Sequence, residues 1–211
     1  MLDQKTVEKF IDELGSSSPT PGGGSVAALV ASLASALGSM VFNLTVNKKV
    51  YNECSDEDKM LVDKSLVLCV KHQGKFLDLM NKDTESFLTL MAAFKLPKES
   101  SDEKVVRSEK IKQGYKGALE VPLSVAEEAY KVYEYVETAA KLGNKNIISD
   151  AGVSALMLQA SIESAILNVK INLSGIKDET YIEKINLRCT QLVKQGRARR
   201  DEILSVVIES L

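Results

Sequence analysis

The sequence predicts an all-α protein, an up-and-down bundle of about five to six helices in a single domain spanning residues 1–211. Apolar side chains recur at helical spacing along nearly the whole chain. No segment alternates apolar and polar residues over the length of a strand, and no Asn-Gly or Asp-Gly pair marks a hairpin turn. Long helices joined by short turns are typical of such a bundle.

Turn signals divide the chain into its expected helices. Gly15 ends the first helix, and a segment rich in Ser, Pro and Gly connects it to the second. Leu96-Pro97, Gly143-Asn144 and Ser174-Gly175 close later helices, and Pro122 marks a place where the fourth can kink or break. The expected helical ranges are 3–14, 25–47, 56–94, 102–142, 149–173 and 178–210.

Charge and composition exclude several classes of function. With 27 Lys+Arg and 29 Asp+Glu the net charge is −2, whereas nucleic-acid-binding domains are usually basic because they neutralise phosphates. His72 is the only histidine, and the three cysteines are far apart, so neither a metal site nor a disulfide framework is expected. We therefore expect no nucleic-acid partner and no bound metal.

One uncharged segment, residues 14–47, raises the question of a membrane span. Residues 26–46 are long and apolar enough to cross a bilayer. They carry Ser, Asn and Thr side chains, however, and no Trp or Tyr flanks them, which favours a buried helix. The polar N-terminus lacks a signal region, so we expect a cytoplasmic protein outside the membrane.

The glycine-rich connection is the first candidate for function. Pro21-Gly22-Gly23-Gly24 leads directly into a helix, where free backbone N–H groups can approach an anion or a polar ring edge. The alternative is a flexible hinge with a helix cap.

Asp83 is the second candidate, because it interrupts an apolar seam. Steps of three and four residues from Leu79 reach Asp83 and then Phe87, which places a carboxylate on the inward face. Burial would raise its pKa and suit it to proton transfer near neutral pH. The alternative is an ion pair with a neighbouring Lys. His72 lies in the same seam and is more simply explained as a hydrogen-bonded core or rim histidine.

A polar stripe along the fifth helix is the third candidate. It consists of Asp150, Ser154, Ser161, Ser164, Asn168 and Asn172. A polar stripe with few charges suits the wall of a cleft for a flat polar ligand. The alternative is contact between helices through small residues. Lys48 and Lys49, at the end of the second helix, complement the helix dipole or attract an anionic substrate.

These segments resemble blocks of the formiminotransferase-cyclodeaminase C-terminal domain family. The similarity covers residues 6–173, in the same order and spacing as in that family. It rests on five blocks: Pro19-Thr20-Pro21-Gly22-Gly23-Gly24-Ser25, Asn43-Leu44-Thr45 with Lys48-Lys49-Val50-Tyr51, Asp83-Thr84-Glu85-Ser86-Phe87, Gly143–Val153 and Leu167–Leu173. Two departures stand out, since Asn47 and Ser86 occupy positions where the family usually has Gly and Ala.

The resemblance implies an all-helical homodimer that acts on folate, polyglutamylated or not, without a cofactor. Known members act at the bridge between N5 and N10 of tetrahydrofolate. Some hydrolyse 5,10-methenyltetrahydrofolate to 10-formyltetrahydrofolate, and the residues in several blocks are most similar to these stand-alone cyclohydrolases. Others are cyclodeaminases, which convert 5-formiminotetrahydrofolate to 5,10-methenyltetrahydrofolate and ammonia. A folate-binding helical dimer without catalysis is the third alternative.

Roles for individual residues follow from the resemblance together with the pattern. Asp83 is the expected catalytic carboxylate that stabilises the cationic carbon and moves a proton, with Asp150 as its competitor. Lys48 and Lys49 are expected to meet the glutamate tail. The expected substrate-binding residues are Pro21, Gly22, Gly23, Gly24, Lys48, Lys49, Asn146, Ser149, Asn168 and Asn172.

Overall fold

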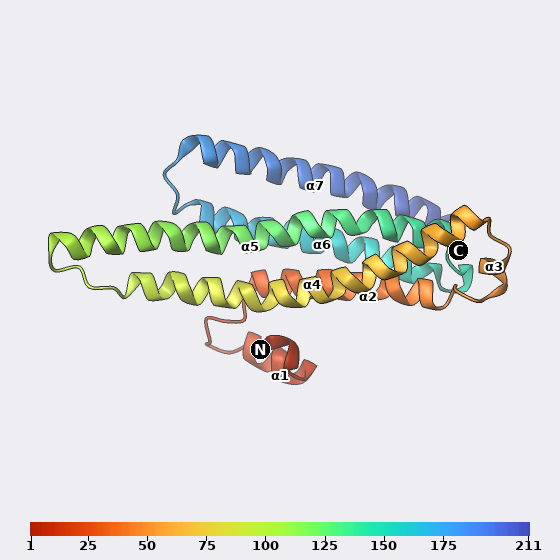
Figure 1. Ribbon diagram of the computed structural model, residues 1–211, viewed down its shortest axis with the longest axis horizontal. Helices are drawn as coiled ribbons and strands as arrows, with labels where there is room; N and C mark the ends of the chain where they lie inside the picture. The colour runs from red at the N-terminus through yellow and green to blue at the C-terminus, as the bar shows by residue number, and fades with distance from the viewer.

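The computed structural model describes all 211 residues and confirms the all-α fold (Figure 1). Five long helices form the bundle, and the chain contains no strand. The elements in order are η1 (Leu2–Gln4), α1 (Val7–Leu14), α2 (Gly23–Asn43), α3 (Lys49–Asn52), α4 (Asp56–Phe94), α5 (Ser101–Leu142), η2 (Lys145–Ile147), α6 (Ile148–Leu173) and α7 (Glu179–Ile208).

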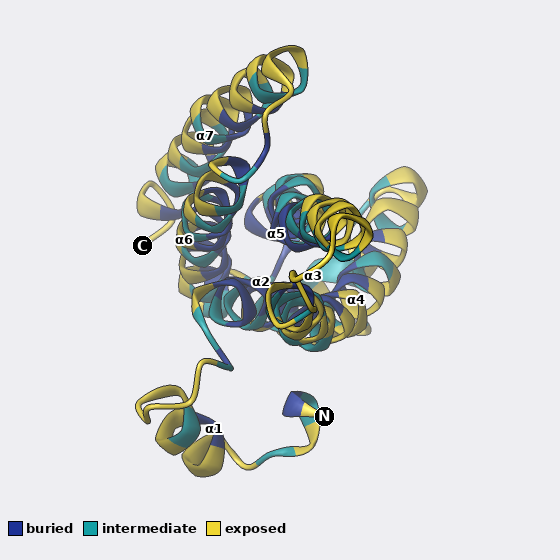
Figure 2. Ribbon diagram, turned by 90° about the vertical axis from the view of Figure 1, so that its left-hand side faces the viewer, coloured by how far each residue is buried: buried dark blue, intermediate teal, exposed yellow.

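Helix α2 is central to the bundle, because it packs against α4, α5 and α6. Helix α7 covers α6 and α5 from outside, and its exposed surface faces away from the bundle (Figure 2). The N-terminal turn η1 is fixed to α4, since Asn81 accepts a hydrogen bond from the Leu2 N–H at 2.7 Å and donates one to Asp3 at 2.7 Å. Helix α1 follows this anchor and stands apart from the bundle (Figures 1 and 2).

Small side chains let α2 and α6 approach closely. Ala27 and Ala34 of α2 are buried, and their carbonyl oxygens accept hydrogen bonds from Ser161 at 2.8 Å and Ser154 at 2.7 Å. The serine hydroxyls therefore find partners inside the helix pair, as buried polar groups must. For these two serines the structure supports contact between helices and not a ligand-binding wall.

Two predicted helix boundaries are wrong. The first helix begins at Val7 and not at residue 3, because Thr6 caps it and accepts a hydrogen bond from the Lys9 N–H at 3.3 Å. The second helix ends at Asn43 and not at residue 47. Beyond it, Asn47 has a positive φ of 62°, which turns the chain into α3.

Pro122 does not break the fourth predicted helix. Helix α5 is continuous from Ser101 to Leu142, with Pro122 buried inside it. A capping box between Ser100 and Glu103 fixes its beginning. The carbonyl group that Pro122 leaves without a helical donor belongs to Ala118, and its partner is described below.

Two segments, α2 and residues 145–173, are long and apolar enough to cross a membrane. More than half of each apolar window is buried inside the bundle, as is expected of core helices. The prediction of a protein outside the membrane stays a prediction.

We expect the left-handed backbone at Asn47 to make this exposed position sensitive to substitution. Asn47→Ala should lower the free energy of unfolding by about 1 kcal/mol, because a Cβ without a compensating amide is disfavoured at positive φ. Asn47→Gly should be at least as stable as the wild type. Urea unfolding of the three proteins would contradict this if the Ala variant matched the Gly variant.

Candidate active site

A cavity of about 380 Å³ opens where α2 begins. Its walls come from four helices that are distant in sequence: the first turn of α2, the second half of α4, the first half of α5 and the end of α6. We call it the Asp83 cleft, and it is defined by Gly22, Gly23, Gly24, Asp83, Ser86, Phe87, Phe94, Tyr115, Ala118, Asn168 and Asn172.

The glycines allow α2 to begin directly against polar side chains. A Cβ at Gly24 would lie 2.1 Å from Asp83 Oδ1, and one at Gly23 would lie 3.2 Å from Asn168 Nδ2. The N-cap residue Gly22 has no side chain to cap this helix. The backbone N–H of Ser25 interacts with Asp83, which leaves the N–H groups of Gly23 and Gly24 available to a ligand. Pro21 is buried and does not line the cleft.

Asp83 has one hydrogen-bond partner among the side chains and no partner of opposite charge. The buried Ser25 hydroxyl donates to Asp83 Oδ2 at 2.8 Å. Burial raises the pKa of Asp83 above its ordinary value, and the Ser25 hydroxyl and backbone N–H oppose this rise only in part. The predicted alternative, an ion pair with Lys, is absent. The carboxyl group is therefore suited to exchanging a proton closer to neutral pH.

Asn172 is held in place by the proline in α5. Pro122 has no N–H to donate to the carbonyl of Ala118, one helical turn earlier. Asn172 Nδ2 donates to that carbonyl at 2.9 Å and to the carbonyl of Asn168 at 2.9 Å. A side chain of α6 thus replaces the missing backbone donor of α5, which fixes the amide group at the cleft wall.

Asn168 and Asn172 both offer a free acceptor. Asn168 Nδ2 donates to the Ser164 carbonyl at 2.9 Å, so both amide nitrogens are engaged with backbone oxygens. Neither Oδ1 atom accepts a hydrogen bond within the chain. The two acceptors suit a ligand that presents N–H groups along one edge.

Two aromatic side chains, Phe94 and Tyr115, also line the cleft. The rings of Phe94 and Tyr115 meet edge to face, with centroids 6.0 Å apart. A Cβ at Gly175 would lie 2.4 Å from the Tyr115 ring, so only glycine permits the ring to rest against the end of α6. The cleft therefore combines polar groups with a pair of aromatic rings.

The other predicted site residues lie at the opposite end of the bundle. There the Asn144 N–H donates to Thr45 Oγ1 at 2.9 Å, which joins the start of α6 to the end of α2. Asp150 and Asn168 are eighteen residues apart on α6, a rise of about 27 Å. Within one chain the structure therefore brings the glycines, Asp83, Asn168 and Asn172 together, but it leaves a separate group of Lys48, Lys49, Asn146, Ser149 and Asp150.

His72 lies outside the cleft and has its hydrogen bonds satisfied. Its Nδ1 is 2.9 Å from the Leu68 carbonyl, and its Nε2 is 3.2 Å from Glu128 Oε2. Lys75 and Lys131 also contact Glu128, at 3.0 and 2.7 Å. This matches the interpretation of a satisfied core histidine.

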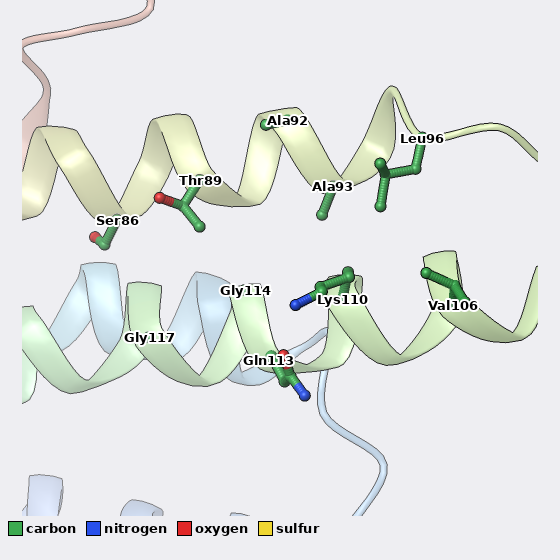
Figure 3. A pocket seen from close by; sticks show the side chains of 10 residues that line it. All are labelled: Ser86, Thr89, Ala92, Ala93, Leu96, Val106, Lys110, Gln113, Gly114 and Gly117. Atoms are coloured by element: carbon green, nitrogen blue, oxygen red, sulfur yellow. The ribbon is translucent and has the colours of Figure 1, made fainter. Parts of the chain in front are cut away.

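A larger cavity of about 570 Å³ lies between α4 and α5 (Figure 3). It shares Ser86 with the Asp83 cleft, but Lys110 is the only charged residue that lines it. With no carboxylate and no helix N-terminus, it lacks the groups that acid–base chemistry requires. No group of three or more His, Cys, Asp or Glu side chains is placed to hold a metal ion.

Sequence reasoning missed several residues of the cleft. Ser25 belongs to the glycine-rich block that the sequence already singled out, and this block is the sequence feature that could have identified it. Tyr115 and Gly175 had none, because α5 and the end of α6 meet only in the folded chain. The sequence indicated Pro122 only as a place where the fourth helix could kink or break.

The fold and the cleft together define a class: an all-helical protein in which a partly buried carboxylate without a cationic partner shares a cleft with amide groups and a helix N-terminus. A sequence profile of the formiminotransferase-cyclodeaminase family matches residues 6–191. The chain belongs to this family.

Three named proteins are also similar to this chain over nearly its whole length. A methenyltetrahydrofolate cyclohydrolase of Methylorubrum extorquens is 38% identical over 207 residues, 98% of both chains. A formimidoyltransferase-cyclodeaminase of Rattus norvegicus is 30% identical over 199 residues, 94% of this chain but 36% of that protein. The crystal structure of formiminotetrahydrofolate cyclodeaminase from Thermotoga maritima superposes with a TM-score of 0.80 at 28% identity, covering 100% of this chain and 98% of that one.

We expect Gly24→Ala to destabilise the protein, although Ala is the better helix former by about 1 kcal/mol. The new Cβ would collide with Asp83. Gly22→Ala is the matched control, since nothing lies within 4 Å of a Cβ there, and it should stay within about 0.5 kcal/mol of the wild type. Urea unfolding that ranks Gly24→Ala above the wild type would refute the close contact.

We also expect Pro122 and Asn172 to be energetically coupled. Asn172→Leu should cost about 1–3 kcal/mol, because it leaves the Ala118 carbonyl without a donor. In a Pro122→Ala background the cost should be smaller, because the backbone at position 122 then has an N–H that can donate to the Ala118 carbonyl. A double-mutant cycle measured by chemical denaturation tests this. Equal costs in both backgrounds would show that the carbonyl does not depend on Asn172.

Proposed function

We propose that this chain hydrolyses 5,10-methenyltetrahydrofolate to 10-formyltetrahydrofolate. The observation that carries the proposal is Asp83, a partly buried carboxylate without a cationic partner that lines a cleft together with amide groups. The end-to-end similarity to a methenyltetrahydrofolate cyclohydrolase supports this choice of reaction. The substrate's bridging carbon is a cationic amidinium, which a partly buried carboxylate without a cationic partner is well suited to stabilise.

Hydrolysis requires water to add to that carbon and lose a proton, which gives a neutral tetrahedral carbinolamine. N5 is then protonated and its bond to the carbon breaks, while the hydroxyl group loses its proton and becomes the formyl carbonyl. We assign the proton transfers to Asp83, whose raised pKa brings it nearer to neutral pH. The hydroxyl of Ser25 holds the carboxylate in position at 2.8 Å. No cofactor or metal has a role in this scheme.

The rest of the cleft would bind the ring system. The Oδ1 atoms of Asn168 and Asn172 would accept hydrogen bonds from the pterin N–H groups, and the start of α2, Gly22–Gly24, would lie over the ring. Phe94 and Tyr115 would contact the aromatic p-aminobenzoyl group. Lys48 and Lys49 stay our predicted partners for a glutamate tail, including polyglutamate.

The second candidate is 5-formiminotetrahydrofolate cyclodeamination. The cyclodeaminase relatives and the Thermotoga maritima structure favour it. There N10 would add to the formimino carbon and ammonia would leave, again with one carboxylate moving the proton. A cleft that binds folate without turnover is the third alternative, and Asp83 argues against it.

We further propose that the protein acts as a homodimer in the cytoplasm. The resemblance implies the dimer, and three free cysteines without a disulfide suit a reducing compartment.

We expect Asp83→Asn to lower kcat by about 10²- to 10⁴-fold, because the amide cannot take a proton. Loss of the amidinium chromophore of 5,10-methenyltetrahydrofolate measures this. Asp78→Asn, at an exposed position on the same helix, is the matched control and should keep wild-type activity. If the wild type is no faster than buffer, gain of the same chromophore from 5-formiminotetrahydrofolate would identify the cyclodeaminase instead.

The pH dependence of kcat should report the state of Asp83. Its pKa is raised in the folded protein, so the carboxylate becomes protonated at a pH above that of an ordinary Asp. If the ionised form accepts the proton, kcat falls as the pH falls through this raised pKa. A profile for Asp78→Asn should coincide with that of the wild type. A kcat that stays constant down to pH 4 would exclude Asp83 as the base.

A further inference from the structure

A separate cavity of about 430 Å³ lies between the first half of α5 and the loop that joins α6 to α7. We call it the lysine pocket, because Lys112, Lys116 and Lys177 line it. Asp178 is the only carboxylate among its lining residues. That carboxylate is already engaged as the cap of α7, where it accepts a hydrogen bond from the Tyr181 N–H at 3.0 Å. The pocket therefore carries an excess of positive charge, which attracts an anion.

The three lysines of the pocket have no carboxylate partner. None of them forms an ion pair, whereas Lys75 and Lys131 elsewhere in the bundle both contact Glu128. Lys112 and Lys116 are four residues apart on α5, a spacing at which like charges repel each other. An anionic ligand would remove this repulsion and supply the missing partners.

An aromatic ring holds one of these cations beside the pocket. The amine of Lys116 lies 5.4 Å from the centroid of the Tyr181 ring, within the range of a cation–π contact. Such a contact limits the positions of a long side chain but leaves its N–H groups free to donate. Lys116 is therefore partly ordered for binding before any ligand arrives.

The lysine pocket adjoins the Asp83 cleft along both helices that form the two cavities. On α5, Tyr115 lines the cleft and Lys116 lines the pocket. After α6, Ser174 lines the cleft and Gly175 lines the pocket, and the Tyr115 ring rests against Gly175. A ligand that leaves the cleft past Tyr115 thus reaches the lysines directly. Figure 1 shows that α5 extends well beyond the α6–α7 loop, so its first turns offer further surface to a long ligand.

We propose that the lysine pocket binds the glutamate tail of the folate whose ring system occupies the Asp83 cleft. This rests on the proposed function and deepens it, because it names the residues that distinguish short tails from long ones. In the proposed binding mode the p-aminobenzoyl group contacts Phe94 and Tyr115, and the tail is attached to the far side of that group. The first glutamate carries two carboxylates, and each further γ-linked glutamate adds one. Lysine amines are suited to pair with these groups.

Other cations of the chain are less well placed for this role. Lys48 and Lys49, which the sequence predicts for it, lie at the opposite end of the bundle from the Asp83 cleft of the same chain, and Lys49 is 3.7 Å from Glu53. The larger cavity between α4 and α5 offers Lys110 alone (Figure 3). The lysine pocket combines three cations with direct contact to the cleft.

Steady-state kinetics with substrates of different tail length test the proposal. The variant Lys112→Gln/Lys116→Gln/Lys177→Gln should raise the KM for the triglutamate form of 5,10-methenyltetrahydrofolate about tenfold, because three charge-assisted contacts are lost. The KM for the monoglutamate form should rise less, since fewer carboxylates reach the pocket. The effect should appear in KM and not in kcat, because the tail is remote from the reacting carbon. Equal KM values in the wild type and the variant would overturn the proposal.

The matched control removes the same charge elsewhere. Lys9→Gln/Lys64→Gln/Lys71→Gln changes three exposed lysines of α1 and α4 and should keep the wild-type KM for both substrates. If this control raised KM as much as the pocket variant, general attraction by net charge would be the cause and the pocket would be refuted. A rise in the triglutamate KM in Lys48→Gln/Lys49→Gln but not in the pocket variant would place the tail at the other end.

A binding measurement separates the pocket from the reaction. p-Aminobenzoyl-tri-γ-glutamate, which lacks the pterin, is titrated calorimetrically and should bind the pocket variant about tenfold more weakly than the wild type. Asp178→Asn should bind it several-fold more tightly, because the change removes the one carboxylate of the pocket while Asn still caps α7. Loss of stability cannot produce this gain.

Unchanged affinity in the pocket variant, or weaker binding in Asp178→Asn, would contradict the proposal. If the fragment binds as expected while the wild type turns over neither folate, the pocket stands and only the proposed reaction fails. If the wild type hydrolyses 5,10-methenyltetrahydrofolate but neither KM nor fragment binding depends on the three lysines, the reaction stands and only the pocket fails.

Discussion

The close approach of α2 to its neighbours is the constraint on which the rest of the structure depends. Most of its buried residues are Gly, Ala or Ser, with Val41 and Phe42 as the larger exceptions near its end, and Ala28 and Ala31 are fully buried against the bundle. Larger side chains there would push α4 and α6 outward and separate the serine hydroxyls of α6 from the carbonyl groups of α2. Most of the Leu, Val and Met residues of α2 therefore lie on its outer side. Since the helix has no charged residue, its inner face is closely packed and its outer face is apolar.

The chemistry of the cleft follows from this packing. Because Gly24 has no side chain, Asp83 can lie against the first turn of α2, where it is partly buried. Desolvation of a carboxylate is unfavourable, and no cation compensates for it here. The hydroxyl of Ser25 and the helix N-terminus give partial compensation. The desolvated Asp83 therefore lowers the stability of the fold, as is expected of a residue in a functional site.

Much of the fold could be predicted from sequence, because helical periodicity and turn residues are local signals. The range 56–94 was recovered without error, since Ser55 and Lys95 bound a strongly patterned helix. The end of the second helix was misjudged because a tertiary contact, Asn144 with Thr45, holds the chain that follows it. Asp83 was identified because it interrupts a seam. Tyr115 was not, because its role depends on Gly175, sixty residues away.

Asn172 of α6 is linked to α5 because it donates a hydrogen bond to the Ala118 carbonyl, which Pro122 leaves without a backbone donor. A proline normally weakens a helix interior, yet here it creates an acceptor that only a side chain from elsewhere can satisfy. The two positions should therefore covary among relatives. Sequences that replace the proline would be released from the need for an amide at the second position, and sequences that keep it would retain Asn or an equivalent donor. Selection for a well-placed amide in the cleft would then preserve a proline that makes no contact with any ligand.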